Sequence, residues 1–143
     1  MIATFVMSLV IGTSLIALQT GFKYIDVARG DTLASQIMQS EIERLRLMAW
    51  SKTAPTGVVD SITELPASET VDLSTMFSTN VALASRFTVT RTVAADTTSP
   101  RDVRYITVTV NWSSSDGKSH TRSFTTMYAK NGLYDYYYTL ANT

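Results

Sequence analysis

Hydrophobic residues are concentrated at the start of the chain. The first 22 residues, MIATFVMSLVIGTSLIALQTGF, include no charged side chain. About 20 consecutive apolar residues are needed for a helix to cross the hydrocarbon core of a bilayer, so this stretch is just long enough. A secretory signal peptide would need a basic stretch before the apolar run and small residues at a cleavage site after it, and residues 19–23 form a poor site. We therefore expect residues 1–22 to be a retained apolar half-helix.

The helical pattern continues beyond residue 22, but on one face only. Over residues 23–51 the apolar positions recur mostly at steps of three and four, which is typical of an amphipathic helix. No proline occurs before Pro55, and the residue before a proline avoids the helical region, so we expect one helix from Met1 to about Trp50. Such a helix is about 75 Å long, too long for its own head to cover. Its other faces carry three i,i+3 pairs of opposite charge, interpreted as surface pairs worth about 0.2–0.5 kcal/mol each: Asp26/Arg29, Glu41/Arg44 and Glu43/Arg46.

From residue 85 onward the hydrophobic period changes to two, which predicts strands. Alternation is clear over residues 87–93, 105–112 and 121–128, and residues 133–140 can add a fourth strand. Asp116-Gly117, between the second and third of these segments, is a hairpin signal. We interpret the Ser/Thr-rich residues 51–84 as a long connection with at most a short strand or a helical turn.

An antiparallel sheet with one apolar face needs a cover, and the amphipathic half-helix is the natural one. The chain is therefore predicted to be an α+β protein in three parts: the apolar half-helix 1–22, the amphipathic half-helix 23–51, and a head of connecting loop and sheet at 52–143. We expect the core between helix and sheet to contain Val27, Ala34, Met38, Ile42, Leu45, Ile106, Val108, Val110 and Trp112.

Composition narrows the possible functions. The chain has 143 residues with 12 basic and 12 acidic side chains, so it has no net charge with which to attract nucleic acid. It has no cysteine and a single histidine, His120, which we interpret as an exposed strand residue rather than a catalytic base. We therefore expect neither an enzyme nor a resident cofactor, and no nucleic-acid partner.

Two groups of side chains are candidate binding surfaces. Four carboxylates in predicted loops could meet around a calcium ion, although they lack the regular spacing of an EF-hand: Asp96, Asp102, Asp116 and Asp135. Near the C-terminus, four tyrosines crowd five positions and suit either a contact between subunits or an edge strand that covers the core: Tyr134, Tyr136, Tyr137 and Tyr138.

The order of these parts resembles that of type IV pilins and of the pseudopilins of type II secretion. Residues 1–21 are similar to the N-terminal helix of prepilin-like proteins from just after their glutamate. The stretch LASQIMQSEIERLR at 33–46 resembles the later helix of the minor-pilin branch, and residues 108–112, the Asp-Gly turn and residues 122–127 resemble that branch's closing hairpin. The family's basic leader and early glutamate are not in this sequence, whose first acidic residue is Asp26, and we expect the chain to begin inside the mature helix.

The resemblance implies a subunit of a helical filament of identical copies. It implies display at a bacterial cell surface, after an inner-membrane-anchored precursor stage, with pilus or secretion assembly machinery as a partner. The alternatives are a minor pilin, a pseudopilin, or a monomeric membrane-anchored binding domain. Gly12, Thr13 and Ser14 are the weakest stretch for helix formation, and are interpreted either as the segment that unwinds in assembled pilins or as small packing residues. The residues expected to pack in the filament core are Ile2, Phe5, Val6, Leu9, Val10, Leu15, Ile16, Leu18 and Phe22.

Overall fold

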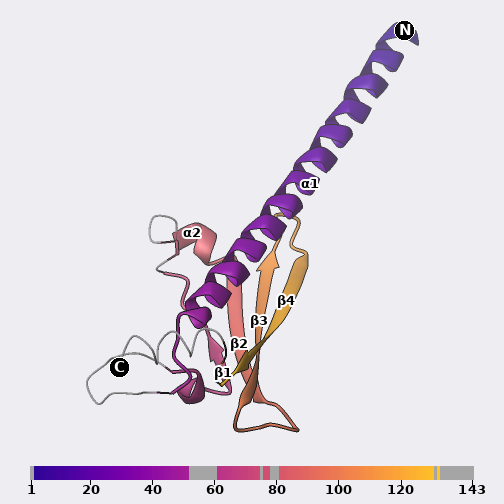
Figure 1. Ribbon diagram of the computed structural model, residues 1–143. Coiled ribbons are helices and arrows are strands. Elements are labelled where there is room, and N and C mark those ends of the chain that lie inside the picture. Colours follow the sequence, from indigo (N-terminus) through magenta and orange to yellow (C-terminus); the bar gives the residue numbers. More distant parts are fainter. Residues whose placement is uncertain (1, 52–60, 75, 78–80, 131, 133–143) are drawn as a thin grey trace.

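A computed structural model describes residues 2–51, 61–74, 76–77, 81–130 and 132. The first element is a single straight helix, α1 (Ile2–Arg46), of 45 residues, which is about 67 Å long at 1.5 Å per residue (Figure 1). It ends four residues before the predicted boundary at Trp50. Its last turn tightens, because Leu47 N–H donates to Arg44 O at 3.2 Å and Met48 N–H to Leu45 O at 3.1 Å, both bonds that span three residues.

Four strands form one antiparallel sheet in the order β1-β2-β3-β4. The strands are β1 (Ser68–Thr70), β2 (Phe87–Ala95), β3 (Val103–Ser113) and β4 (Ser119–Ala129). The α+β class is thus confirmed, and the three longest strands follow the three clear segments of period two. The short β1 lies inside the predicted connection 51–84, beside a 3-10 turn at Ile62–Glu64 and a four-residue helix, α2 (Val81–Ala84). The strand suggested at 133–140 lies outside the described residues.

The β3–β4 connection is a tight turn of the predicted kind. Gly117 has a φ of 79°, a backbone conformation that side chains with a Cβ rarely adopt. Two backbone bonds close the turn, from Gly117 N–H to Ser114 O and from Ser114 N–H to Lys118 O, both 2.9 Å. This turn sets the register that pairs Trp112 with His120 and Val110 with Arg122.

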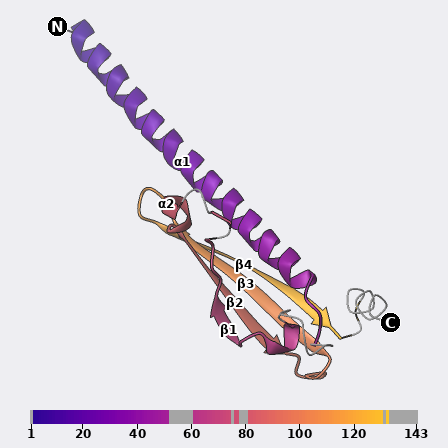
Figure 2. The same cartoon turned by 90° about the vertical axis from the view of Figure 1, so that its left-hand side faces the viewer.

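The second half of α1 lies along one face of the sheet (Figure 2). The core between them is built from alternate residues of β2 and β3 and from every third or fourth residue of α1. Val27, expected there, is only half-buried, because α1 is just beginning to meet the sheet at that point. The buried residues that α1, β2 and β3 contribute to the core are Ala34, Ile37, Met38, Ile42, Leu45, Phe87, Val89, Ile106, Val108, Val110 and Trp112.

Gly30 is the point of closest approach between helix and sheet. A Cβ placed on Gly30 would lie 2.4 Å from Trp112 Nε1 and 2.9 Å from Trp112 Cδ1. The indole has little room to move, because its ring stacks on Phe87 at 6.3 Å and on His120 at 5.4 Å. The absence of a side chain at residue 30 therefore allows α1 to pack directly against Trp112.

Gly30→Ala is expected to destabilise the head by about 1–3 kcal/mol through overpacking, although alanine is the better helix former. The measurement is thermal unfolding followed by tryptophan fluorescence, since Trp50 and Trp112, the two tryptophans, are both buried in the head. Gly21→Ala is the matched control, because nothing lies within 4 Å of its added Cβ. Equal melting temperatures for the two variants would contradict the assigned contact.

Candidate functional site

The first half of α1 projects away from the head (Figures 1 and 2). Its large apolar side chains are exposed. Their exposed fractions run from 53% at Ile11 to 71% at Phe5. Within the described part of the chain, α1 is the helix long and apolar enough to cross a membrane, and none of its apolar window is buried inside the protein. We call residues 2–22 the apolar segment. Of the residues expected in a filament core, those whose side chains are described are all exposed in the single chain: Phe5, Val6, Leu9, Val10, Leu15, Ile16, Leu18 and Phe22.

An exposed apolar helix of this length requires a covering environment. Burying one large apolar side chain gains about 1.5–3 kcal/mol, and soluble monomers rarely expose contiguous apolar patches of more than a few hundred Å². The eight side chains named above are 54–71% exposed, so together they would gain about 10 kcal/mol on entering lipid or a protein interior. The apolar segment is the strongest candidate functional surface in the described structure.

The hydroxyl groups of the apolar segment are already paired within the helix. Ser8 Oγ donates to Thr4 O at 2.9 Å, Ser14 Oγ to Val10 O at 2.8 Å, and Thr20 Oγ1 to Ile16 O at 2.9 Å. A hydroxyl paired in this way can enter an apolar environment without leaving an unsatisfied donor. The helix is continuous through Gly12, Thr13 and Ser14, and Thr13 Oγ1 lies 3.0 Å from both Leu9 O and Val10 O.

The second half of α1 is attached to the head by three acidic side chains as well as by the core. Asp26 pairs with Arg86 at 3.2 Å, Asp31 with Arg122 at 2.7 Å, and Glu41 with Arg91 at 2.8 Å. The arginines precede β2, lie in β4 and lie in β2, respectively. Because the contacts are spread over four turns of α1, they fix both the rotation and the axial position of the helix on the sheet.

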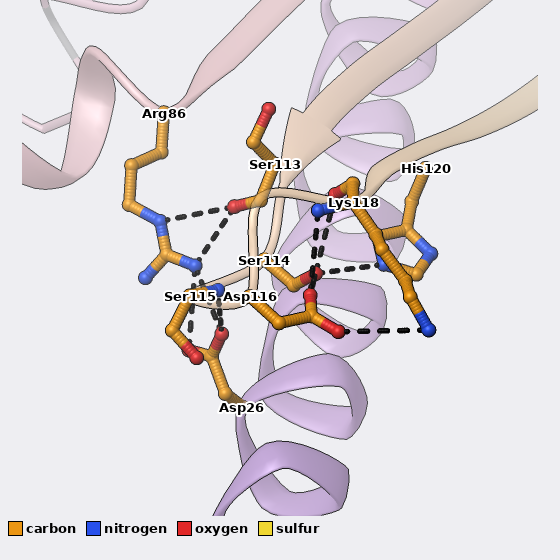
Figure 3. A network of polar contacts seen from close by, with 8 residues as sticks. All are labelled: Asp26, Arg86, Ser113, Ser114, Ser115, Asp116, Lys118 and His120. Carbon is orange, nitrogen blue, oxygen red and sulfur yellow. Dashed lines mark hydrogen bonds and ion pairs between the residues drawn. The ribbon is translucent and has the colours of Figure 1, made fainter.

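Asp26 connects α1 to the β3–β4 turn (Figure 3). Its Oδ2 accepts the backbone N–H of Ser115 at 2.7 Å and a 3.2 Å bond from Arg86 Nη2. The same guanidinium also donates from Nη2 to Ser113 O at 2.9 Å. The predicted surface pair with Arg29 is thus replaced by a contact between three elements: the helix, the residue before β2 and the end of β3.

Glu41 and Arg91 form a buried ion pair at the other end of the interface. Glu41 is 0% exposed and Arg91 2%. Glu41 also accepts bonds of 2.9 and 2.8 Å from Arg44, and Arg91 pairs with Glu69, which lies directly opposite it on β1. The sequence interpretation of Glu41/Arg44 as a surface pair is therefore wrong for Glu41, because Arg91 draws that carboxylate into the core. By contrast, Glu43 and Arg46 form an exposed pair at 2.8 Å.

Both carboxylates titrate below their ordinary range. The backbone N–H of Ser115 is the largest influence on Asp26, and with Arg86 it lowers the pKa from the ordinary 3.8. Burial alone would raise the pKa of Glu41, but the hydrogen bonds and charges of Arg44 and Arg91 outweigh it and lower the pKa from the ordinary 4.5. In the unfolded chain both groups bind protons more readily than in the folded protein.

The free energy of unfolding of the head is therefore expected to fall as the pH drops below about 4.5, and to go on falling until the pH is below the lowered pKa values of Asp26 and Glu41. In this window the unfolded chain binds more protons than the folded protein, so protons favour unfolding. Above that window the contribution of both groups is fully present. The measurement is urea unfolding by tryptophan fluorescence between pH 6 and pH 3. The double variant Asp26→Asn with Glu41→Gln should be less stable at pH 6 and should show a shallower decline, and an unchanged slope would contradict the assignment.

Ser114, Asp116 and His120 come together in the β3–β4 turn without forming a catalytic arrangement. Ser114 Oγ donates to Asp116 Oδ1 and lies 3.1 Å from His120 Nε2. Because the hydroxyl proton is given to the carboxylate, Nε2 must act as the donor toward Ser114 and cannot take a proton from it. His120 was expected to be exposed, but it is half-buried because its ring stacks on Trp112.

The carboxylates considered for calcium do not come together. Asp96 and Asp102 lie in the β2–β3 connection, whereas Asp116 lies in the β3–β4 turn. The 11 residues of β3 separate these connections by about 36 Å. No group of three His, Cys, Asp or Glu side chains among the described residues could hold a metal ion. Asp135 and the cluster Tyr134, Tyr136, Tyr137 and Tyr138 lie outside the described residues.

Sequence reasoning did not identify two residues that position the site, Gly30 and Arg91. Arg91 shares the period of Phe87, Val89 and Val93 on the core-facing side of β2, and a charge at such a position indicates a buried partner of opposite sign. The signal was therefore present in the alternation. Gly30 gives no comparable signal, because the close approach of Trp112 depends on how α1 crosses the sheet.

Comparison of the chain with protein-family models, with curated proteins and with solved structures finds no match.

Proposed function

We propose that this chain, whose architecture of a long apolar N-terminal helix packed on a four-stranded antiparallel sheet is pilin-like, is a structural subunit of a type IV pilus-like filament. One observation supports the proposal above the others. Residues 2–22 are helical and uncharged, and the large apolar side chains from Phe5 to Phe22 are exposed, while the same helix is held firmly on the head from Asp26 onward. A subunit with such a free apolar helix can polymerise through it and display the head outside.

Membrane anchoring and polymerisation can use the same surface. Lipid chains and a bundle of apolar helices are similarly apolar, so transfer between them changes the hydrophobic free energy little, and close packing decides the outcome. The apolar segment would span the inner membrane before assembly and pack against its copies afterwards. An assembly machinery that extracts subunits, and a location on the bacterial cell surface, belong to this proposal.

The attachment of α1 to the head supports force transmission along such a filament. A pull on the head reaches the apolar segment through the core, the buried Glu41–Arg91 pair and the contacts of Asp26 and Asp31. Gly12, Thr13 and Ser14 lie inside the apolar segment, at its weakest point for helix formation. Unwinding at these residues would lengthen the subunit in a stretched filament and leave the head intact.

A minor pilin or a pseudopilin is the alternative within the same architecture, and a monomeric membrane-anchored binding domain is the alternative outside it. Shearing of cells distinguishes them. A shaft subunit should be the main protein of the sheared filaments. A minor pilin or pseudopilin should be scarce there, and its deletion should abolish assembly or secretion. A monomeric domain should stay in the membrane fraction.

The proposed role requires no catalysis and no cofactor. The Ser114–His120 contact supports this view, because the hydroxyl is bonded to Asp116 and is 7% exposed.

A further inference from the structure

The β3–β4 turn lies close to the point where the apolar segment ends. The last apolar residue of the uncharged run is Phe22, and Lys23 is the first charged residue. Asp26 holds the backbone of Ser115 at 2.7 Å, so the turn is fixed at the level of residue 26 on α1. Figure 1 shows β3 running toward the free half of α1, which places the turn at the end of the head that faces the apolar segment.

This position fixes the depth of the turn relative to a bilayer. Asp26 is four positions after Phe22, which corresponds to about 6 Å along the helix axis. Each headgroup layer of a bilayer is about 5–7 Å thick, the difference between a total of 40–45 Å and a hydrocarbon core of about 30 Å. When Phe22 lies at the edge of the hydrocarbon, the turn therefore lies at the level of the headgroups or at their outer boundary.

The side chains around this end of the head are more basic than acidic. Lys23 and Arg29 are exposed on α1, and the side chain of Lys118 at the tip of the turn is 76% exposed. Two further arginines, Arg86 and Arg122, lie at the same end. Four acidic side chains stand against these five basic ones, namely Asp26, Asp31, Asp72 and Asp116, and three of the basic side chains are paired with an acid: Arg86 with Asp26, Arg122 with Asp31 and Lys118 with Asp116. The excess of positive charge suits the negative surface of a leaflet that contains anionic phospholipids.

We propose that the β3–β4 turn and the basic side chains Lys23, Arg29 and Lys118 bind the headgroups of anionic phospholipids while the subunit is anchored in the membrane. The inference rests on the proposed function, because it requires the apolar segment to span a bilayer. Each basic side chain close to an anionic leaflet favours contact roughly fivefold. The contact holds the head upright at the membrane surface, and extraction of the subunit into a filament breaks it.

The absence of cysteine makes a clean depth measurement possible. The full chain with Ser115→Cys is labelled with a fluorophore at residue 115 and reconstituted in nanodiscs. The nanodiscs contain phosphatidylglycerol and a lipid with a nitroxide on its headgroup, and the measured quantity is the quenching of the fluorophore by the nitroxide. Residue 115 is exposed and its backbone N–H makes the 2.7 Å bond to Asp26, so the substitution keeps that bond and removes the contact of the Ser115 hydroxyl with Asp26. Thr97→Cys, exposed in the β2–β3 connection at the opposite end of β3, is the control. Severalfold stronger quenching at residue 115 than at residue 97 is expected, and equal quenching would overturn the inference.

The role of anionic lipid is tested with the same label. Replacing phosphatidylglycerol by phosphatidylcholine should weaken the quenching at residue 115, and the triple variant Lys23→Gln, Arg29→Gln and Lys118→Gln should weaken it to the same level in the anionic nanodisc. Quenching that does not depend on phosphatidylglycerol would overturn the choice of anionic lipid. Protein that fails to enter nanodiscs at all would contradict the proposed function, whereas insertion with an unquenched residue 115 contradicts this inference alone.

Discussion

Leu9→Lys is expected to weaken membrane anchoring about a hundredfold and to prevent filament assembly. Leu9 lies near the middle of the apolar segment and is 58% exposed in the single chain. A lysine near the centre of a membrane-spanning helix costs about 3 kcal/mol relative to an apolar residue, which is roughly a hundredfold in the membrane equilibrium. In a filament core the charge would have no water and no partner, so the penalty is at least as large there.

Gln36→Lys is the matched control for Leu9→Lys. Residue 36 lies on the same helix, is exposed, and is on the half of α1 that is attached to the head. The substitution Gln36→Lys adds the same charge at a position that faces water. Membrane fractionation and the yield of sheared filaments measure the effect, with wild-type behaviour expected for Gln36→Lys. Normal assembly of Leu9→Lys would refute the role of the apolar segment.

Glu41→Gln is expected to reduce the free energy of unfolding of the head by about 3 kcal/mol or more. Removing one partner of a buried ion pair leaves an uncompensated charge, at a typical cost of 3–5 kcal/mol. Arg91 would keep only Glu69, whose side chain is 47% exposed. The measurement is urea unfolding of the detergent-solubilised full chain by tryptophan fluorescence at pH 7.

Glu43→Gln supplies the comparison that isolates burial. Glu43 and Glu41 lie on the same helix and each is 2.8 Å from an arginine three residues later, but the side chain of Glu43 is 54% exposed. An exposed pair contributes about 0–1 kcal/mol, so this variant should unfold almost as the wild type does. A similar loss for the two variants would mean that Glu41 is not held in the core as assigned.

The coarse fold could be predicted from the sequence because its signals are local. A long run without charge or proline, a stripe of apolar residues at helical spacing, and a change of period at residue 85 each depend on neighbouring residues only. The Asp116-Gly117 turn is equally local, since it needs a glycine with positive φ. The placement of Ile106, Val108, Val110 and Trp112 on one face follows from the alternation along β3.

The contacts that position the helix could not be predicted in the same way. Asp26 and Glu41 each have an arginine three residues later, so sequence spacing favours a local pair. The fold gives Asp26 a different partner, Arg86 from 60 residues away, and adds Arg91 from 50 residues away to the pair that Glu41 makes with Arg44. These long-range pairs form because of how α1 crosses the sheet, and this crossing is set by the close contact between Gly30 and Trp112. The half-burial of Val27 has the same origin, because it lies where α1 first meets the head.

A division of roles along α1 follows from these contacts. From Asp26 to Leu45 the helix packs on its own head through buried apolar residues and through the ion pairs of three acidic side chains. Before Lys23 its large apolar side chains are exposed, and the hydroxyl groups of Ser8, Ser14 and Thr20 are bonded within the helix. The apolar segment can therefore enter lipid or a protein interior. The second half of α1 holds the head at a fixed position relative to the apolar segment.

A reconstruction by electron cryomicroscopy of material sheared from cells that produce the protein tests the central claim most directly. We expect helical filaments in which residues 2–22 of each copy form a central bundle in contact with other copies, with the sheet of each head at the outside. Dispersed single molecules, with the apolar segment surrounded by detergent or lipid and touching no other copy, would contradict it.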